Sequence, residues 1–161
     1  MRALRVLGVV LFVAIAGLFS GGAASAAPTT AASTTAAPAL AAPRLVSGTP
    51  CAATARACIE LSSNSSWLIR DGAVEYGPVP ITHGREGFRT PPGTFQVTFK
   101  DRDHVSSIYD APMPYSVFFN GGIAFHEGSL RQLSHGCIHL SHDAAVTYFN
   151  YLNPGDVVQV V

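Results

Sequence analysis

Charged side chains are scarce in this chain of 161 residues, of which only 12% are Asp, Glu, Lys or Arg. Proteins that bind nucleic acid need a basic face, and a formal net charge of zero gives no support to that function. When Arg2 and Arg5 are set aside, 8 basic residues stand against 10 acidic ones. This balance gives no support to strong attraction for anionic lipid either.

Cysteine is also rare, with three residues and no Cys-x-x-Cys pair. Cys51 and Cys58 are close in sequence and separated by small residues, so we expect them to form a disulfide, as in proteins of oxidising compartments. Closing so short a loop stabilises a fold by roughly 2–3 kcal/mol on the chain-entropy estimate. Cys137 is then the odd thiol, and a free thiol in such a compartment needs a functional reason.

Long apolar runs are missing, because the longest one, residues 6–19, is shorter than the ~18 residues expected of a membrane-spanning helix. Basic residues precede this run and the small residues Ala24, Ser25 and Ala26 follow it. We therefore predict a signal peptide over residues 1–26, export, and no membrane span after cleavage; an uncleaved anchor is the alternative. No cysteine follows the run, which argues against a lipid-modified N-terminus.

Residues 27–49 consist mainly of Ala, Thr, Pro and Ser, with few large apolar side chains to offset the entropy of ordering. We predict a disordered spacer here, which either extends the following domain from a surface or is a linker without a role. Residues 50–161 then form one folded domain.

The domain reads as a series of short β-prone runs with one late helix, which is typical of a mainly β barrel or sandwich. Asp71-Gly72 and residues 120–122 (Asn-Gly-Gly) predict two hairpins. Residues 94–99 alternate in polarity and predict one half-buried strand, whereas residues 100–110 are predicted to be irregular. Ser141 is the expected N-cap of a helix that continues to Leu152, and a last strand covers residues 157–161.

The chemistry concentrates at residues 134–137 (Ser-His-Gly-Cys). A thiol of ordinary pKa is only a few per cent thiolate at neutral pH, so a catalytic cysteine needs an adjacent base. His126 ends an apolar run upstream and can supply this base if its strand lies beside Cys137. Gly136 removes a side chain where substrate must approach, and successive backbone N–H groups of residues 135–137 can hold an oxyanion.

This constellation resembles the signature of the L,D-transpeptidase (YkuD-like) catalytic domain. The resemblance rests on His126 followed by residues 134–137, on residues 90–95 (Thr-Pro-Pro-Gly-Thr-Phe) and on residues 113–115 (Met-Pro-Tyr). It covers roughly residues 55–161. It implies an L,D-transpeptidase-like β fold and a cysteine acyltransferase that needs no cofactor.

The resemblance also implies residue roles. Cys137 is the nucleophile and His126 the base, with the Glu127 carbonyl fixing its tautomer. Ser134 and His135 shape the loop, and the amides of His135, Gly136 and Cys137 serve as donors.

The implied substrate is a peptidoglycan stem tetrapeptide. It acylates the cysteine with release of D-alanine, and an amine of a second stem then takes the acyl group to form a 3→3 cross-link. Carbapenem β-lactams acylate the same cysteine in this family.

For other residues near the motif, both a substrate-binding role and a purely structural role are possible. Tyr115 is a wall of the donor pocket or a packing residue, and Arg131 attracts a stem carboxylate or is a plain surface charge. His139 stands where the family usually carries arginine or asparagine, so it is expected to alter contacts to the acceptor or leaving group. The gap between His126 and Ser134 is shorter than is common in the family, which predicts a reduced flap over the site.

Two other functions remain open at this stage. The same thioester resolved by water would make the protein an L,D-carboxypeptidase. Alternatively, neutral imidazoles and a thiolate suit zinc, which would make the domain a zinc-stabilised, non-enzymatic wall-binding module. The candidate zinc ligands are His126, His135, Cys137, His139 and His142.

Overall fold

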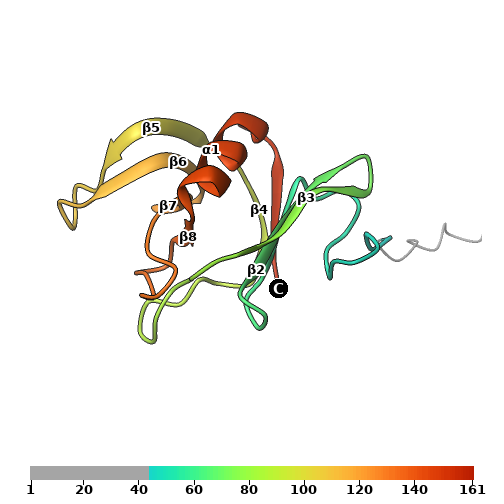
Figure 1. Cartoon of the computed structure of the whole chain (residues 1–161), viewed down its shortest axis with the longest axis horizontal. Coiled ribbons are helices and arrows are strands. Elements are labelled where there is room, and N and C mark those ends of the chain that lie inside the picture. The colour runs from blue at the N-terminus through green and yellow to red at the C-terminus, as the bar shows by residue number, and fades with distance from the viewer. Residues whose placement is uncertain (1–43) are drawn as a thin grey trace, which may run out of the picture. The chain divides into compact units, whose positions relative to one another are not determined.

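The structure is a computed structural model that describes residues 44–161, and the predicted signal peptide and most of the predicted spacer lie outside these residues (Figure 1). The strands are β1 (Ala57–Glu60), β2 (Ser65–Arg70), β3 (Ala73–Pro80), β4 (Gly93–Gln96), β5 (Phe99–Val105), β6 (Pro112–Asn120), β7 (Ile123–Glu127), β8 (Ile138–Leu140) and β9 (Val157–Val160). The helix is α1 (His142–Tyr151). No helix within the described residues is long and apolar enough to cross a membrane.

The strands form two sheets, with orders β3-β2-β1-β9-β4 and β5-β6-β7-β8. In the first sheet, β9 lies parallel to β1 and antiparallel to β4, so the last strand of the chain occupies an inner position. The mainly β prediction is confirmed, and because the two sheets do not close on each other, the fold is a sandwich rather than a barrel.

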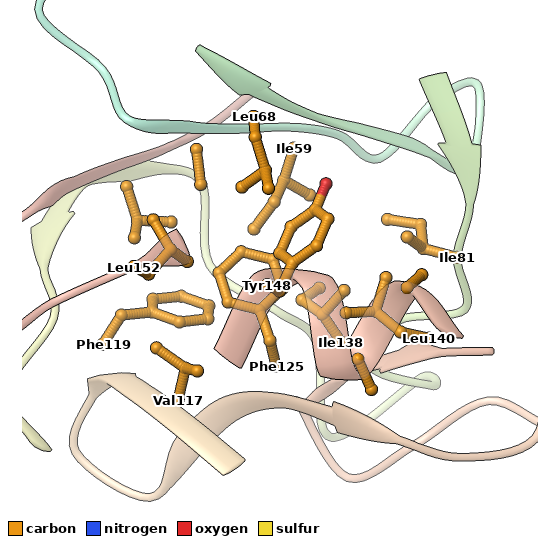
Figure 2. Close-up of a cluster of buried hydrophobic side chains, with 14 of the residues drawn as sticks. Ile59, Leu68, Ile81, Val117, Phe119, Phe125, Ile138, Leu140, Tyr148 and Leu152 are labelled. Carbon is orange, nitrogen blue, oxygen red and sulfur yellow. The ribbon is translucent and has the colours of Figure 1, made fainter. Parts of the chain in front are cut away.

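The main core lies between the sheets and is closed by the helix (Figure 2). Tyr148 on α1 is fully buried between Ile59 and Leu68 of the first sheet and Phe125 of the second. Its hydroxyl donates to Ser66 Oγ at 2.8 Å, and Ser66 Oγ donates in turn to the Cys58 carbonyl at 2.7 Å. The helix is thereby attached to the first sheet by a polar link inside an otherwise apolar core.

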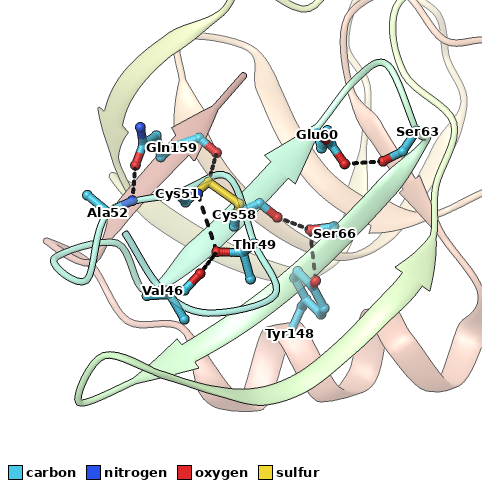
Figure 3. Close-up of a disulfide and its surroundings, with 10 residues drawn as sticks. All are labelled: Val46, Thr49, Cys51, Ala52, Cys58, Glu60, Ser63, Ser66, Tyr148 and Gln159. Carbon is cyan, nitrogen blue, oxygen red and sulfur yellow. Dashed lines mark hydrogen bonds between the residues drawn. A yellow bond between two sulfur atoms is a disulfide. The ribbon is translucent and has the colours of Figure 1, made fainter. Parts of the chain in front are cut away.

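A second, smaller core lies under the segment that precedes β1 (Figure 3). The predicted disulfide between Cys51 and Cys58 is present, and it packs with Val46 and Trp67. The Ala52 N–H donates to the Gln159 side-chain oxygen at 2.8 Å, which ties this segment to β9. Val46, which precedes the boundary expected at residue 50, is only 2% exposed and belongs to this core.

Both predicted hairpins are present. Asp71 and Gly72 join β2 to β3 and both have positive φ, 51° and 76°, as a type I′ turn requires. The second turn, with Gly121 at φ 55°, joins β6 to β7. Ser141 caps α1 by accepting a hydrogen bond from the Ala144 N–H, as predicted.

The prediction of one strand over residues 94–99 is wrong. This segment is divided between β4 and β5, which belong to different sheets. Val97 lies between them and is buried, whereas Phe99 begins β5 and is 47% exposed. The prediction of an irregular segment over residues 100–110 is also wrong in part, because residues 100–105 continue β5. Its polar side chains are compatible with a strand because β5 is the outermost strand of its sheet.

Candidate active site

The site is built on β7 and β8, which run parallel with Phe125 opposite Ile138 and His126 opposite His139. Phe125 and Ile138 point into the main core and are fully buried. Since successive side chains of a strand point to opposite faces, His126 and His139 lie on the outer face. Cys137, directly before β8, packs against Ala124 on that same face. Cys137 and His126 therefore lie on the same face as diagonal neighbours on adjacent strands.

His126 is held in the orientation that a general base requires. Its Nδ1 donates to the Glu127 carbonyl at 2.7 Å, the contact expected from the sequence, so the lone pair of the neutral ring is on Nε2. The side chain is only 6% exposed. Burial lowers the pKa of His126 to about 4, which keeps the ring neutral at neutral pH.

The Cys137 thiol is half-buried and free. Its Sγ donates to the Gly122 carbonyl at 3.6 Å, and the residue packs against the small buried cluster of Met113, Phe118 and Ala124. Burial raises the pKa of the Cys137 thiol. Both groups are therefore neutral at neutral pH.

The loop before Cys137 is fixed by side-chain hydrogen bonds. Ser134 Oγ donates to the Cys137 carbonyl at 2.6 Å and accepts from the Gly136 N–H at 2.9 Å. Thr90 Oγ1 donates to the Gly136 carbonyl at 2.7 Å. Gly136 has φ 118°, a conformation that other residues rarely adopt. The Gly136 amide is thus engaged within the loop by the Ser134 hydroxyl.

His139 stands next to His126, with ring centroids 4.9 Å apart. Its Nδ1 donates to the Ser129 carbonyl at 3.0 Å and lies 3.0 Å from Thr82 Oγ1, which leaves Nε2 unprotonated in the neutral ring. A Cβ at Gly128 would lie 2.6 Å from the His139 ring, so glycine is needed there. His139 is therefore part of the outer face and is held by the loop over residues 128–133.

The other two predicted substrate-binding residues, Tyr115 and Arg131, make their contacts within the described residues to groups other than the Cys137 thiol. The Tyr115 ring lies against His142 and Phe149 of the helix, with centroids 5.5 and 5.9 Å away, and these contacts favour the packing interpretation. Arg131 is exposed in the loop after β7, where its N–H donates to Ser129 Oγ at 3.2 Å. Among residues 44–161 no carboxylate pairs with it.

The candidate zinc ligands are directed to different partners. His135 Nε2 is 2.6 Å from an Arg85 nitrogen, and His142 Nδ1 is 2.8 Å from a Glu127 carboxylate oxygen. Within the described part of the chain, no three His, Cys, Asp or Glu side chains lie close enough to hold a metal ion. This arrangement gives the zinc hypothesis no support.

The far end of the β5–β6 hairpin covers part of the site, and the sequence did not indicate this role. His104 pairs with Met113, yet its ring contacts Phe118 further along β6, with centroids 4.9 Å apart, so the hairpin bends over the outer face. At its tip, Tyr109 stacks on His135 at 4.3 Å. The reduced flap was predicted from the gap between residues 126 and 134, but this hairpin precedes that gap in the chain.

Sequence reasoning missed three residues that hold the site together. Thr82 Oγ1 bonds to carbonyl groups of the loop over residues 128–133. Thr90 bonds to Gly136 in the loop before Cys137, and Arg85 contacts His135 in the same loop. Thr90 lies in the motif that carried the family resemblance, which was the available signal. Nothing in the sequence marked Thr82 or Arg85, because their partners lie some 50 residues away in the chain.

The profile of the L,D-transpeptidase catalytic domain (YkuD) matches residues 54–160. The chain therefore belongs to the L,D-transpeptidase catalytic domain family. No curated protein matches the chain.

Solved structures of similar fold carry the same designation. An L,D-transpeptidase from Stackebrandtia nassauensis is 29% identical with a TM-score of 0.63, and the match covers 65% of this chain and 54% of that one. An L,D-transpeptidase in complex with imipenem is also 29% identical, with a TM-score of 0.60 and coverage of 65% and 57%. L,D-transpeptidase 3 from Mycobacterium tuberculosis, with a faropenem-derived adduct, is 25% identical, with a TM-score of 0.59 and coverage of 65% and 58%. This chain thus matches little more than half the length of these relatives.

Proposed function

We propose that this domain is a peptidoglycan L,D-transpeptidase. The observation that carries the proposal is the placement of Cys137 and His126 on one face of adjacent strands, with the His126 Nδ1 held by the Glu127 carbonyl. Membership of the family supports it. The disulfide agrees with an extracytoplasmic protein, and the predicted signal peptide would deliver it there.

The first half-reaction acylates the cysteine. His126 Nε2 takes the thiol proton as Cys137 Sγ attacks the carbonyl carbon of the third stem residue. The tetrahedral oxyanion accepts hydrogen bonds from the amides of His135 and Cys137, since the Gly136 amide is engaged by Ser134. Collapse breaks the C–N bond, and His126 returns its proton to the departing D-alanine amine, leaving a thioester on Cys137.

The second half-reaction transfers the acyl group. An amine of another stem attacks the thioester carbonyl and loses a proton to His126 as the C–S bond breaks. The proton then returns to the Cys137 sulfur, and the product is a 3→3 cross-link. Water in place of the amine would give a tripeptide, the L,D-carboxypeptidase outcome.

Intact-protein mass spectrometry with imipenem tests the nucleophile. We expect the protein to gain one drug mass at Cys137 and Cys137→Ala to gain none, since Cys51 and Cys58 are bonded to each other. His126→Gln serves as the second variant and should be acylated roughly 100-fold or more slowly, in line with loss of a general base. Equal labelling of Cys137→Ala would refute the assignment.

Product analysis then distinguishes transfer from hydrolysis. With tetrapeptide stems as the only substrate, transfer yields a cross-linked dimer and hydrolysis yields tripeptide, and the two differ in mass. A wild-type protein that takes imipenem but forms only tripeptide would be an L,D-carboxypeptidase.

A further inference from the structure

The loop over residues 83–90 is fastened to the loop that carries the nucleophile. The Ser134 N–H donates to the His83 carbonyl at 2.9 Å, and the Arg85 N–H donates to the Ser134 carbonyl at 3.0 Å. Thr90 Oγ1 bonds to the Gly136 carbonyl at the other end of the loop. The backbone of Arg85 is therefore fixed relative to Cys137.

The side chain of Arg85 is also restrained. One terminal nitrogen donates to His135 Nε2 at 2.6 Å, and the guanidinium carbon lies 4.7 Å from the centroid of the Phe88 ring. The His135 ring itself lies against Phe88 on one side and Tyr109 on another, with centroids 4.7 and 4.3 Å away. The guanidinium is thus held beside the loop that carries Cys137, so that little side-chain entropy would be lost when it binds a ligand.

The positive charge of Arg85 has no counter-ion in the domain. Arg56 and Arg70 pair with Asp156 and Glu75, but no carboxylate within residues 44–161 lies within ion-pair distance of Arg85. The residue is exposed. A guanidinium has five N–H donors in a planar fork that matches a carboxylate, and only one nitrogen is engaged by His135.

We propose that Arg85 binds the free carboxylate of the amino acid that leaves when Cys137 is acylated. This inference rests on the proposed function, in which the scissile bond lies one residue from the C-terminus of the stem. The carboxylate of the leaving residue then lies close to the scissile bond. When the carbonyl carbon of that bond is positioned at Cys137 Sγ, this carboxylate is also near the loop that carries the nucleophile. A fixed guanidinium beside the loop of the nucleophile therefore selects donors that end directly after the leaving residue.

The test compares two donors, a tetrapeptide stem with a free C-terminal carboxylate and the same stem as its C-terminal amide. Wild-type protein should prefer the free acid by roughly 10- to 100-fold in kcat/KM, the range expected for a hydrogen-bonded charge pair. Arg85→Gln should lose this preference, chiefly through a higher KM for the acid, and Arg85→Lys should retain part of it. Arg89→Gln removes an equally exposed charge from the same loop and should behave as wild type.

Imipenem labelling separates this inference from the proposed function. Arg85→Gln should still gain one drug mass at Cys137, which shows that it is folded and reactive. If Arg85→Gln keeps the preference for the free acid, or if Arg131→Gln loses it instead, the role of Arg85 is refuted while the transpeptidase assignment stands. If wild-type protein neither takes imipenem nor turns over either stem, both proposals fail together.

Discussion

The two faces of the second sheet differ in the kind of side chain they carry and in what holds those side chains in place. On the inner face, Val117, Phe119, Phe125, Ile138 and Leu140 are almost completely buried and pack against the helix and the first sheet. On the outer face, alternate residues of the same strands are Phe118, Ala124, His126 and His139, with Cys137 directly before β8. The inner face is held by apolar packing. On the outer face, the two histidine rings are each held by a hydrogen bond from Nδ1 to a backbone carbonyl.

This difference matters because the proposed catalytic groups lie outside the main core. Phe125 and His126 are neighbours in sequence, yet Phe125 belongs to the main core and His126 to the proposed catalytic pair. Substitutions on the inner face should therefore act mainly on stability, and those on the outer face mainly on reactivity.

The sharpest test of the comparison pairs Phe125→Ala with Cys137→Ala. Phe125→Ala opens a cavity in the main core and should lower the free energy of unfolding by about 3–5 kcal/mol. Cys137→Ala, at a half-buried position outside the main core, should cost about 1 kcal/mol or less and should abolish acylation. Denaturant unfolding measures both, and equal destabilisation would contradict the division between faces.

The next effect concerns His126 and pH. Burial lowers its pKa from 6.5 to about 4, so between these values the unfolded chain binds a proton that the folded domain does not. The free energy of unfolding should therefore fall as pH drops from about 6.5 to about 4, by roughly 3 kcal/mol from this group.

The control for this prediction is His126→Gln, which has no titrating ring. Denaturant unfolding across this pH range should show a shallower dependence in the variant than in wild type. If the two profiles are parallel, His126 is not buried as a neutral ring.

The smallest expected effect falls on the hydrogen bonds that support the outer face. Ser134→Ala leaves the Gly136 amide and the Cys137 carbonyl without their shared partner in a buried place, and should cost about 1–3 kcal/mol. It should also slow imipenem acylation while leaving one drug mass at completion. Ser63→Ala, at an exposed turn, is the matched control and should change stability by at most about 0.5 kcal/mol. A Ser134 variant that acylates at the wild-type rate would show that the loop keeps its shape without this side chain.

Local signals in the sequence predicted those parts of the fold that local chemistry determines. Asp71-Gly72 adopts the positive φ values that its turn requires, and Ser141 caps the helix. The division of residues 94–99 between two sheets was not predictable from alternation. It depends on β4 pairing with β9 and β5 with β6, partners that lie far away or later in the chain.

The site shows the same limit. Cys137 and His126 were predicted because a free thiol and a nearby imidazole are chemically distinctive, and the Glu127 carbonyl contact is local. The contacts of Arg85 with His135 and of Thr90 with Gly136 depend on two loops meeting in space. Thr90 was marked only by its place in the motif that carried the family resemblance, and nothing along the sequence marked Arg85.

The inner position of β9 has a consequence for the order in which the domain can be assembled. Among the elements of residues 44–161, β9 comes last, yet it fills the gap between β1 and β4. Until it is synthesised, those two strands have no partner for the edges that face each other, and the first sheet is split in two. We therefore expect the domain to fold only after its last strand is available, so that incomplete chains present no assembled nucleophile.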